Sequence, residues 1–329
     1  MLYLQRCIDL ALKADSRTFP NPKVGAVIVY DDKIIGEGYH EYAGGPHAEV
    51  NAVNSVKDKE LLPFSTIYVS LEPCNHFGKT PPCVNLMLEH KIPKVVVGCL
   101  DPNPQVAGKG IARLREQGVE VVLAENSSDF QAINQVFFCN QLEKRPYVVL
   151  KWAESQDGFI SPSPPLPYPI SDRENSLFVH QLRAKHHAIM IGANTARIDN
   201  PQLTVRKAVG KSPIRIVWDK HLRLPQDLQL FTDGHETIVL NSLRNDEVGK
   251  LRFYVPSDEQ AWENMQIMAK GLFQDLGICS ILVEGGRGVL QQFIDAKCYD
   301  EVHRFVGKMR FGGGIAAPHF AQINADDSR

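Results

Sequence analysis

The apolar residues in the first part of the chain change repeatedly between the spacing of helices and that of strands. Leu4, Ile8 and Leu12 recur at helical spacing, which predicts a helix over residues 3–14. Residues 24–30 and 34–40 read as strands on either side of a polar turn, which predicts a β-hairpin. Helices and strands are then predicted in alternation, at 47–56 (helix), 67–71 (strand), 83–90 (helix), 94–99 (strand), 109–117 (helix) and 119–123 (strand). This order predicts a three-layer α/β/α unit.

A second alternation of strands and helices follows a polar segment that ends at Pro146. We therefore predict two domains, residues 1–143 and 146–329. Residues 161–169 contain five prolines, which excludes a helix or a central strand there. The remaining pattern predicts an α/β domain, with strands at 148–153, 188–191, 214–218, 237–240, 252–255 and 280–283 and helices at 172–185, 259–276 and 289–296.

Composition narrows the class of protein. A chain of 329 residues is long enough to form two domains, each with its own hydrophobic core. Its formal net charge is −2 and its basic residues are scattered, so no basic surface for binding nucleic acid is indicated. No apolar run approaches the roughly 20 residues of a membrane span, and the first residues lack the apolar core of a signal peptide. Seven widely spaced cysteines, an odd number, indicate reduced thiols. We expect a cytoplasmic protein with no membrane or nucleic-acid partner.

His47, Cys74 and Cys83 have the residue types of a catalytic zinc site. Zn²⁺ takes nitrogen and sulfur ligands in a tetrahedron, and three protein ligands leave one position for water, whose pKa then falls to about 7. Glu49 lies two residues beyond His47, where its carboxylate need not bind the metal and could carry a proton from the water to a leaving amine. Zinc deaminases of bases combine H-x-E with a later P-C-x-x-C.

The match to that motif is partial, because eight residues separate Cys74 from Cys83. The alternative is an ordinary histidine at a helix start and cysteines that are buried or disulfide-linked. Two further functions also remain open, a deaminase of nucleic-acid bases and a zinc-stabilised binding module without turnover. A deaminase of nucleic-acid bases would need a basic or aromatic surface along which a single-stranded nucleic acid can bind. A binding module without turnover would not need Glu49.

The segment between the two cysteines and the residues before the hairpin carry candidate substrate groups. His76 and Lys79 lie between two metal ligands, where positive charge would suit a phosphorylated substrate, although a solvated loop explains them as well. Asn21 offers a donor and an acceptor to the edge of a pyrimidine, but between two prolines it could equally serve a turn.

Two segments of the second half could bind phosphate. Residues 284–288, Glu-Gly-Gly-Arg-Gly, lie between a predicted strand and helix, where backbone N–H groups can approach an anion. They do not form the G-x-G-x-x-G fingerprint, which disfavours a Rossmann domain. Arg183 and Arg206 could hold a phosphate together, or could be an arginine pair on a solvated face.

These motifs together resemble the bifunctional riboflavin-biosynthesis deaminase–reductase family. The resemblance covers the first half through Asn21-Pro22, Pro46-His47-Ala48-Glu49, Leu71-Glu72-Pro73-Cys74, the segment from His76 to Cys83, and Asp101-Pro102-Asn103-Pro104. In that family the longer spacing between the cysteines is the rule. The resemblance implies a cytidine-deaminase-like fold and a 2,5-diaminopyrimidinone substrate that carries a ribosylamino 5′-phosphate. It supports Asn21, His76 and Lys79 as substrate-binding residues.

The second half resembles the reductase half of the same family, which is similar in fold to dihydrofolate reductase. The resemblance implies that NADPH reduces the ribosyl group to a ribityl chain. It implies substrate contacts at Arg183, Leu203, Arg206 and Glu284, and cofactor contacts at Glu154, Pro169, Thr195, Asp199, Gly285, Gly286, Arg287 and Gly288.

Three features depart from that family pattern. Pro169 stands where relatives usually carry a tryptophan, and Glu154 replaces a small residue. Only eleven residues follow Pro318, where relatives continue into a further strand. A missing strand would expose a sheet edge, which would favour a homodimer and leaves open, as an alternative, a deaminase with an impaired reductase domain.

Overall fold

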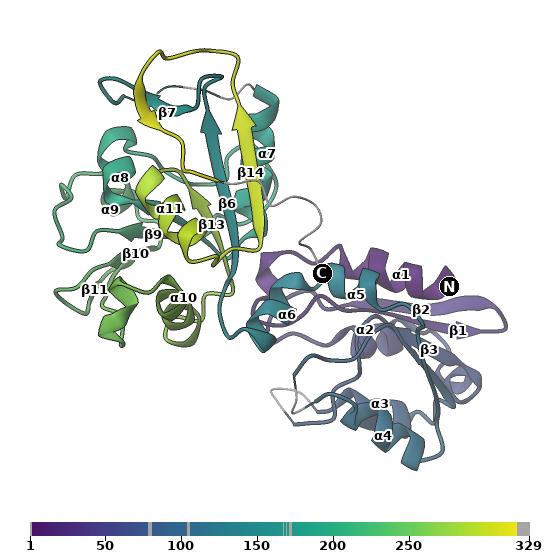
Figure 1. Cartoon of the computed structure of the whole chain (residues 1–329). Coiled ribbons are helices and arrows are strands. Elements are labelled where there is room, and N and C mark those ends of the chain that lie inside the picture. The colour runs from purple at the N-terminus through teal and green to yellow at the C-terminus, as the bar shows by residue number, and fades with distance from the viewer. Residues whose placement is uncertain are drawn as a thin grey trace. The chain divides into compact units, whose positions relative to one another are not determined.

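The computed structural model describes residues 2–77, 81–103, 106–166, 168, 170 and 173–320. The chain divides into two compact units, Met1–Glu143 and Lys144–Arg329, each with its own sheet and helices (Figure 1). None of the helices within the described ranges is both long and apolar enough to cross a bilayer.

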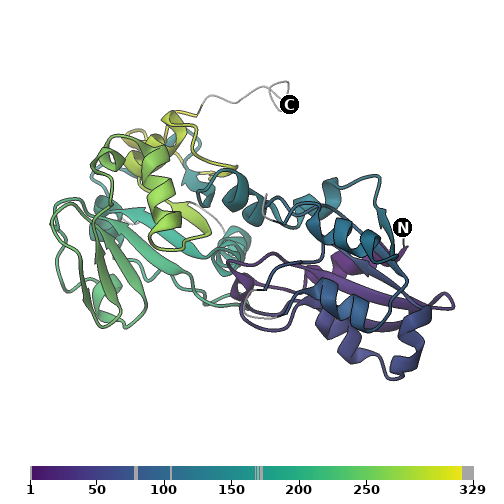
Figure 2. The ribbon, with the colours of Figure 1, turned by 90° about the horizontal axis from the view of Figure 1, so that it is seen from below.

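The first unit is a five-stranded sheet between two layers of helices (Figures 1 and 2). The strand order is β2-β1-β3-β4-β5, in which β1 runs antiparallel to both neighbours and β3, β4 and β5 are parallel. The strands are β1 (Gly25–Tyr30), β2 (Lys33–Tyr39), β3 (Thr66–Val69), β4 (Lys94–Val97) and β5 (Glu120–Leu123). The helices are α1 (Leu2–Ala11), α2 (Ala48–Ser55), α3 (Cys83–Glu89), α4 (Lys109–Glu116), α5 (Ser128–Ala132) and α6 (Gln135–Leu142), with 3-10 turns η1 (Ser16–Thr18) and η2 (Lys59–Phe64).

Two apolar layers fix the places of these helices. On one face α2, α3 and α4 pack on the strands through residues such as Ala52, Met87 and Leu114. On the other face Cys7 and Leu10 of α1 pack on Val27 and Val29 of β1, as the alternation of a strand requires. Close approach is built into the sequence at Gly38 of β2, because a Cβ there would lie 2.6 Å from Ala48 O. Helix α2 therefore sits tightly on the sheet, and its first turn is held in place.

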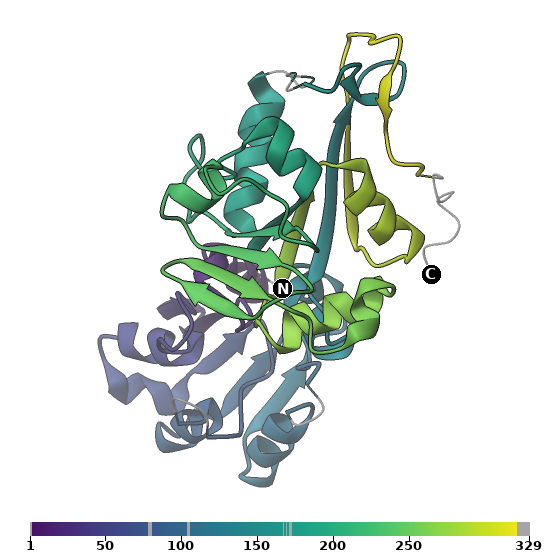
Figure 3. The same ribbon diagram turned by 90° about the vertical axis from the view of Figure 1, so that its left-hand side faces the viewer.

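The second unit is a mainly parallel eight-stranded sheet with helices on both faces (Figures 1 and 3). The order is β11-β12-β10-β9-β8-β13-β6-β14, with only β11 antiparallel to its neighbour. The strands are β6 (Tyr147–Glu154), β8 (Ala188–Gly192), β9 (Ile214–Trp218), β10 (Thr237–Leu240), β11 (Asp246–Val248), β12 (Leu251–Tyr254), β13 (Ser280–Glu284) and β14 (Glu301–Val306); β7 (Phe159–Pro162) and β15 (Gly314–Ala316) pair separately. The helices are α7 (Arg173–Lys185), α8 (Ala193–Asp199), α9 (Gln229–Thr232), α10 (Met265–Gln274) and α11 (Arg287–Asp295), and η3 is Glu259–Trp262.

The cores of this unit explain why its central strands read as continuous apolar runs. Helices α10 and α11 cover one face of the sheet, where Leu150 and Val283 are fully buried. Helices α7, α8 and α9 cover the other face, over Ile189 and Leu282. Strands that are buried on both faces cannot alternate between apolar and polar residues.

Some expected boundaries are wrong, for local reasons. The single helix expected over 259–276 is split into η3 and α10, because the side chain of Asn264 accepts hydrogen bonds from the N–H groups of Gln266 and Ile267 and caps a new helix. The helix expected over 3–14 ends at Ala11. The proline-rich segment begins within β7, where Pro162 ends a strand of the small separate sheet.

Candidate active sites

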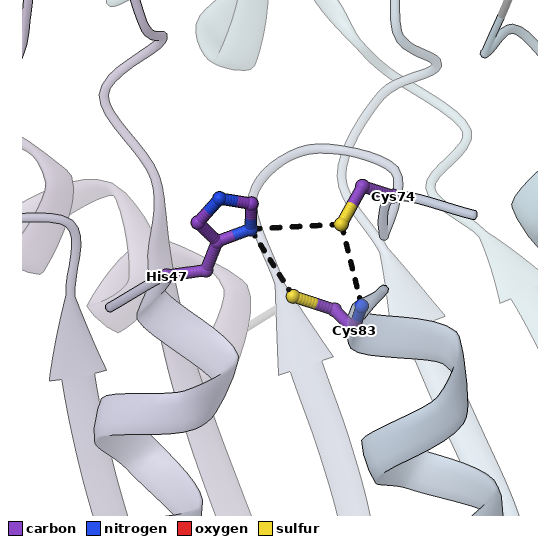
Figure 4. A group of neighbouring side chains, drawn as sticks. All are labelled: His47, Cys74 and Cys83. Carbon is purple, nitrogen blue, oxygen red and sulfur yellow. Dashed lines mark hydrogen bonds between the residues drawn. The ribbon is translucent and has the colours of Figure 1, made fainter. Parts of the chain in front are cut away.

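His47, Cys74 and Cys83 converge from three separate elements (Figure 4). His47 is the N-cap of α2, Cys74 follows β3, and Cys83 is the first residue of α3. His47 Nδ1 lies 3.2 Å from Cys83 Sγ and 3.6 Å from Cys74 Sγ. The three ligand atoms all lie within 4.8 Å of one another, and both thiols are free. The alternative of a disulfide between them is therefore wrong.

This geometry fits a zinc ion. With Zn–N near 2.0 Å and Zn–S near 2.3 Å, a tetrahedron places nitrogen and sulfur ligands about 3.5 Å apart. The N–H of Cys83 at the start of α3 also donates to Cys74 Sγ at 3.3 Å. Hydrogen bonding from Cys83, together with that from His47, holds the pKa of the Cys74 thiol well below its usual range, which favours the thiolate that a metal requires.

Glu49 lies in the first turn of α2 and is 4% exposed. Burial is the main cause that raises the pKa of its carboxyl group to about 7, and the charge of Cys74 adds to the effect. His47, Glu49 and Cys74 line one cavity of about 430 Å³. A carboxyl group with such a pKa, beside the metal ligands but outside their group, is placed to exchange protons near neutral pH.

The same cavity has a polar wall that the sequence only partly indicated. Asn21 and His76 both line it, as expected for substrate-binding residues, whereas Lys79 lies outside the described residues. Asn21 Nδ2 lies 3.0 Å from His40 Nε2, and His40 Nδ1 lies 3.0 Å from Pro46 O. Because a carbonyl only accepts, His40 carries its proton on Nδ1 and accepts from Asn21. The amide orientation of Asn21 is fixed in this way.

Residues of the loop after β4 complete the wall. Asp101 and Asn103 line the cavity, and burial raises the pKa of Asp101 to about 6. Their Asp-Pro-Asn-Pro sequence suggested only turn chemistry, because prolines and short polar side chains are typical of turns. His40 ends an expected strand and belongs to Gly38-Tyr39-His40, which also carries the family resemblance, but no role in the site was assigned to it from the sequence.

In the second unit, Arg183 and Glu284 form a buried bidentate ion pair. Arg183 Nε lies 2.8 Å from Glu284 Oε1, and its second donor lies 2.9 Å from Oε2. Lys151 Nζ lies 3.9 Å from the same carboxylate. Burial opposes ionisation of Glu284, but the charges of Arg183 and Lys151 prevail and lower its pKa. Arg183 does not belong to a solvated face, since its side chain is only 12% exposed.

Arg206 and Leu203 belong to the segment between α8 and β9, next to this pair. Arg183 donates to Thr204 O at 3.3 Å, and the backbone N–H of Arg206 donates to His180 Nδ1 at 3.1 Å. Leu203 is buried in a left-handed conformation with φ of 57°. The side chain of Arg206 is exposed, so it could reach a ligand.

The glycine-rich segment lies where adjacent parallel strands end. Strands β8 and β13 are neighbours, and ligands of such sheets bind at the carboxyl ends of strands. Gly285 and Gly286 have φ of 78° and 77°, and a Cβ on Gly286 would lie 2.7 Å from Thr195 Oγ1. Thr195 of α8 thus packs closely against Gly286, and Arg287 and Gly288 are the first residues of α11. This backbone cradle fits the phosphates of a dinucleotide.

Three other expected cofactor residues lie differently. Asp199 ends α8, and burial raises its pKa. Glu154 is buried, with its carboxylate bound to Trp152 Nε1 at 2.7 Å and paired with Arg304. Pro169 lies outside the described residues. The side chain of Glu154 therefore bonds to residues of β6 and β14, Trp152 and Arg304.

Comparison with known proteins decides between the open functions. Residues 2–99 match the model of the cytidine and deoxycytidylate deaminase zinc-binding region, and residues 146–326 match the RibD C-terminal domain. The riboflavin biosynthesis protein RibD of Aquifex aeolicus is 36% identical over 95% of this chain and 88% of its own length. The chain belongs to the RibD family.

Further members of the RibD family are similar to this chain in sequence and in structure. The one from Actinobacillus pleuropneumoniae is 39% identical over 94% of this chain and 84% of its own length. The solved structure of a diaminohydroxyphosphoribosylaminopyrimidine deaminase/5-amino-6-(5-phosphoribosylamino)uracil reductase from Thermotoga maritima aligns with a TM-score of 0.85 at 35% identity, covering 96% of this chain and 88% of that one. RibD of Acinetobacter baumannii also aligns with a TM-score of 0.85, at 30% identity, over 100% and 92% of the two chains.

The family settles the class of activity. This member of the family is a bifunctional riboflavin-biosynthesis enzyme, a zinc-dependent deaminase with a cytidine-deaminase-like domain and an NADPH-dependent reductase with a domain like dihydrofolate reductase. The resemblance drawn from the motifs is confirmed. A nucleic-acid deaminase, a binding module without turnover and a deaminase with an impaired partner domain are not supported, because both family models match.

Proposed function

We propose that the first unit deaminates 2,5-diamino-6-ribosylamino-4(3H)-pyrimidinone 5′-phosphate and that the second unit reduces the ribosyl group of the product to a ribityl chain. The observation that carries the first step is the convergence of His47, Cys74 and Cys83, with His47, Cys74 and the buried carboxyl group of Glu49 lining one cavity. The Thermotoga maritima relative is named for both reactions.

In the deaminase, His47, Cys74 and Cys83 would hold the zinc ion. Bound there, Zn²⁺ supplies Lewis acidity that favours ionisation of water at neutral pH. Glu49 takes the proton from the attacking water on a carboxylate oxygen and delivers it to the leaving amine. Its burial keeps that carboxyl group available in both protonation states near pH 7.

The wall of the cavity orients the pyrimidine. Asn21 donates one amide hydrogen to His40, so its carbonyl oxygen is the acceptor that it offers to a substrate amine. His76 lines the cavity, and we assign it and Lys79 to the substrate phosphate by their charge. Hydrogen bonds of this kind hold the reacting carbon at the metal side of the cavity.

In the reductase, Arg183, Leu203, Arg206 and Glu284 contact the substrate. Arg206 offers an exposed guanidinium to the phosphate, while Glu284 is held by Arg183 and Lys151 and can accept hydrogen bonds from ribose hydroxyls. Thr195, Asp199 and residues 285–288 hold NADPH, with contributions from Glu154 and Pro169. NADPH supplies the hydride, and the chain supplies the alignment of the two carbons.

Replacing Glu49 with Gln tests the deaminase. The substitution keeps the size of the side chain but removes its capacity to carry a proton. We expect deamination to fall by at least about 100-fold, whereas zinc content and reduction of the deaminated intermediate stay unchanged. The three measurements are ammonia release, metal analysis and NADPH consumption on the same preparation. Undiminished ammonia release would refute the role of Glu49.

Replacing Gly286 with Ala tests the cofactor cradle. The added methyl group would meet Thr195 Oγ1 at 2.7 Å in a left-handed backbone, so we expect NADPH to bind at least about tenfold more weakly. Gly277→Ala is the matched control, because Gly277 has a similar φ of 66° and no atom within 4 Å of an added Cβ. Equal dissociation constants for the two variants, measured by fluorescence titration, would refute the cradle.

We also propose that the protein works in the cytoplasm as a homodimer. The thiols of Cys7, Cys74, Cys83, Cys99 and Cys298 are free, which suits a reducing compartment. In the described part of the second sheet, β14 pairs with β6 alone and offers an edge to a second copy. Light scattering of the purified chain measures the mass, and a monomer at micromolar concentration would contradict the dimer.

A further inference from the structure

Glu72 is a buried carboxylate next to the deaminase site to which the chemistry above gives no part. It stands two residues before Cys74, in the segment that continues from β3, and it is 4% exposed. Its own backbone N–H is bonded to Cys99 O at 2.9 Å, which fixes the start of its side chain at the end of β4. A charge in such a place is costly unless it is hydrogen-bonded.

Four backbone N–H groups donate to this carboxylate. Oε2 accepts from Gly108 at 2.9 Å and from Asp101 at 3.4 Å. Oε1 accepts from Gly110 at 3.0 Å and from Ile111 at 3.4 Å. Three of the four donors lie at the start of α4, where the unpaired N–H groups of a helix favour a negative charge.

The fourth donor, that of Asp101, belongs to the wall of the cavity. Asp101, Asn103 and Val106 line the cavity, and these residues lead from β4 to α4. The approach on the other side is equally close, because a Cβ on Gly110 would lie 2.2 Å from Pro73 O. Glu72 therefore connects the segment that carries the ligand Cys74 with the facing wall of the cavity. It is bonded to that wall at Asp101, near its start, and at Gly108, near its end.

We propose that Glu72 is a positioning residue of the deaminase, whose side chain, through its four hydrogen bonds, sets the distance between the zinc ligand Cys74 and the substrate-binding wall of Asp101 and Asn103. The proposal rests on the proposed deaminase function. It assigns to Glu72 no contact with the metal and no proton transfer.

Two acceptor oxygens are necessary for this task, because each oxygen of Glu72 faces two N–H donors. A carboxylate offers lone pairs on both oxygens and accepts all four hydrogen bonds, and bonds to an ionised acceptor are about twice as strong as neutral ones. Glutamine has the same shape but offers only one oxygen, and its NH₂ group would face two N–H donors. Aspartate keeps the charge but is one methylene shorter, so it cannot reach both pairs of donors.

Glu72→Gln is the variant that tests the proposal, with kinetics of both activities on the full chain loaded with zinc. We expect the KM for deamination to rise about tenfold, the factor that corresponds to one charge-assisted hydrogen bond, with a smaller change in kcat. Zinc content and the kinetics of the reductase should stay as in the wild type. Hydrogen exchange at the amides of Gly108 and Gly110 should become faster.

Glu120→Gln is the control, because it also removes a carboxylate from this unit, one that is exposed, paired with Lys94 and not part of the cavity. A KM in Glu72→Gln equal to that of the control would overturn the proposal, as would loss of zinc, which would give Glu72 a role in the metal site. If Glu72→Gln does not fold, Glu72→Asp must show the raised KM with zinc retained, and a wild-type KM there overturns the proposal. A wild-type chain that does not deaminate the pyrimidine refutes the proposed function instead.

Discussion

Replacing Arg215 with Met is expected to destabilise the reductase unit selectively. Arg215 lies in β9, is 1% exposed and forms a bidentate ion pair with Asp233 at 2.7 and 2.8 Å. It also donates to three carbonyl oxygens and to the hydroxyl of Thr237, which joins β9 to β10 and to the segments on either side. Met fills a similar volume but leaves these acceptors and the carboxylate without their donor.

Breaking a buried ion pair from one side costs about 3–5 kcal/mol. The lower end applies here, because the Asp233 side chain is 20% exposed and can regain water. With a urea dependence of about 2 kcal/mol per molar, the midpoint of unfolding should fall by about 1.5 M. Arg244→Met is the matched control, since the Arg244–Asp246 pair is half exposed and such pairs contribute at most about 1 kcal/mol.

Tryptophan fluorescence reports on this unit alone. All three tryptophans of the chain, Trp152, Trp218 and Trp262, lie in Lys144–Arg329. Deaminase activity in the absence of urea serves as the measure of the other unit and should be unchanged. Adding Asp233→Asn to Arg215→Met should recover part of the loss, because the buried charge is then removed. A shift in Arg215→Met no larger than in Arg244→Met would refute the reasoning.

Three further results are expected. Cys83→Ala should lower bound zinc from about one ion per chain to a small fraction, whereas Cys298→Ala, which removes a buried thiol of the reductase unit, should leave it unchanged; metal analysis that gives equal values would show that Cys83 is not a ligand. Arg183→Met should raise the KM of the reductase by at least about tenfold because Glu284 loses its bidentate partner, and an unchanged KM with normal deaminase kinetics would contradict this. Burial lowers the pKa of His187 from 6.5 to about 4, so the unfolded chain binds a proton below about pH 6.5 and the folded chain does not. The contribution of His187 to the free energy of unfolding of the reductase unit should therefore be fully present above pH 6.5 and fall by up to about 3 kcal/mol toward pH 4. His187→Gln should make the free energy of unfolding depend less on pH in this range. A pH dependence of the variant equal to that of the wild type would exclude His187 as its source.

Most elements could be predicted from the sequence because their periodicity is local. The hairpin of β1 and β2 and the buried strands such as β8 and β13 lie close to their expected positions. The expected helix over 259–276 was wrong because Asn264 competes as a cap, a choice that depends on a single side chain rather than on periodicity. Helix α8 and strand β11 were not predicted, since each is only a few residues long and its pattern is too short to show a period.

The metal site could be predicted because its chemistry is carried by rare residue types. An imidazole and two thiols with a glutamate beside them suggest zinc wherever they lie in the chain, and the structure brings all three ligands together. Glu72 and His40 could not be found in this way. Both lie in segments that resemble the family, but a motif does not show whether a glutamate or a histidine in it contacts solvent, a partner or a cavity.

The sequence by itself determined the order of helices and strands, the likeness to the RibD family and the types of ligand available for zinc. Only the tertiary structure decided which donor meets which acceptor. Glu72 bonds to Gly108 across 36 positions and Arg183 to Glu284 across 101, and such pairs are set by strand order and by close approaches at glycines. The physical reason is that a hydrogen bond depends on distances of about 3 Å in space, which the spacing of residues along a chain does not contain.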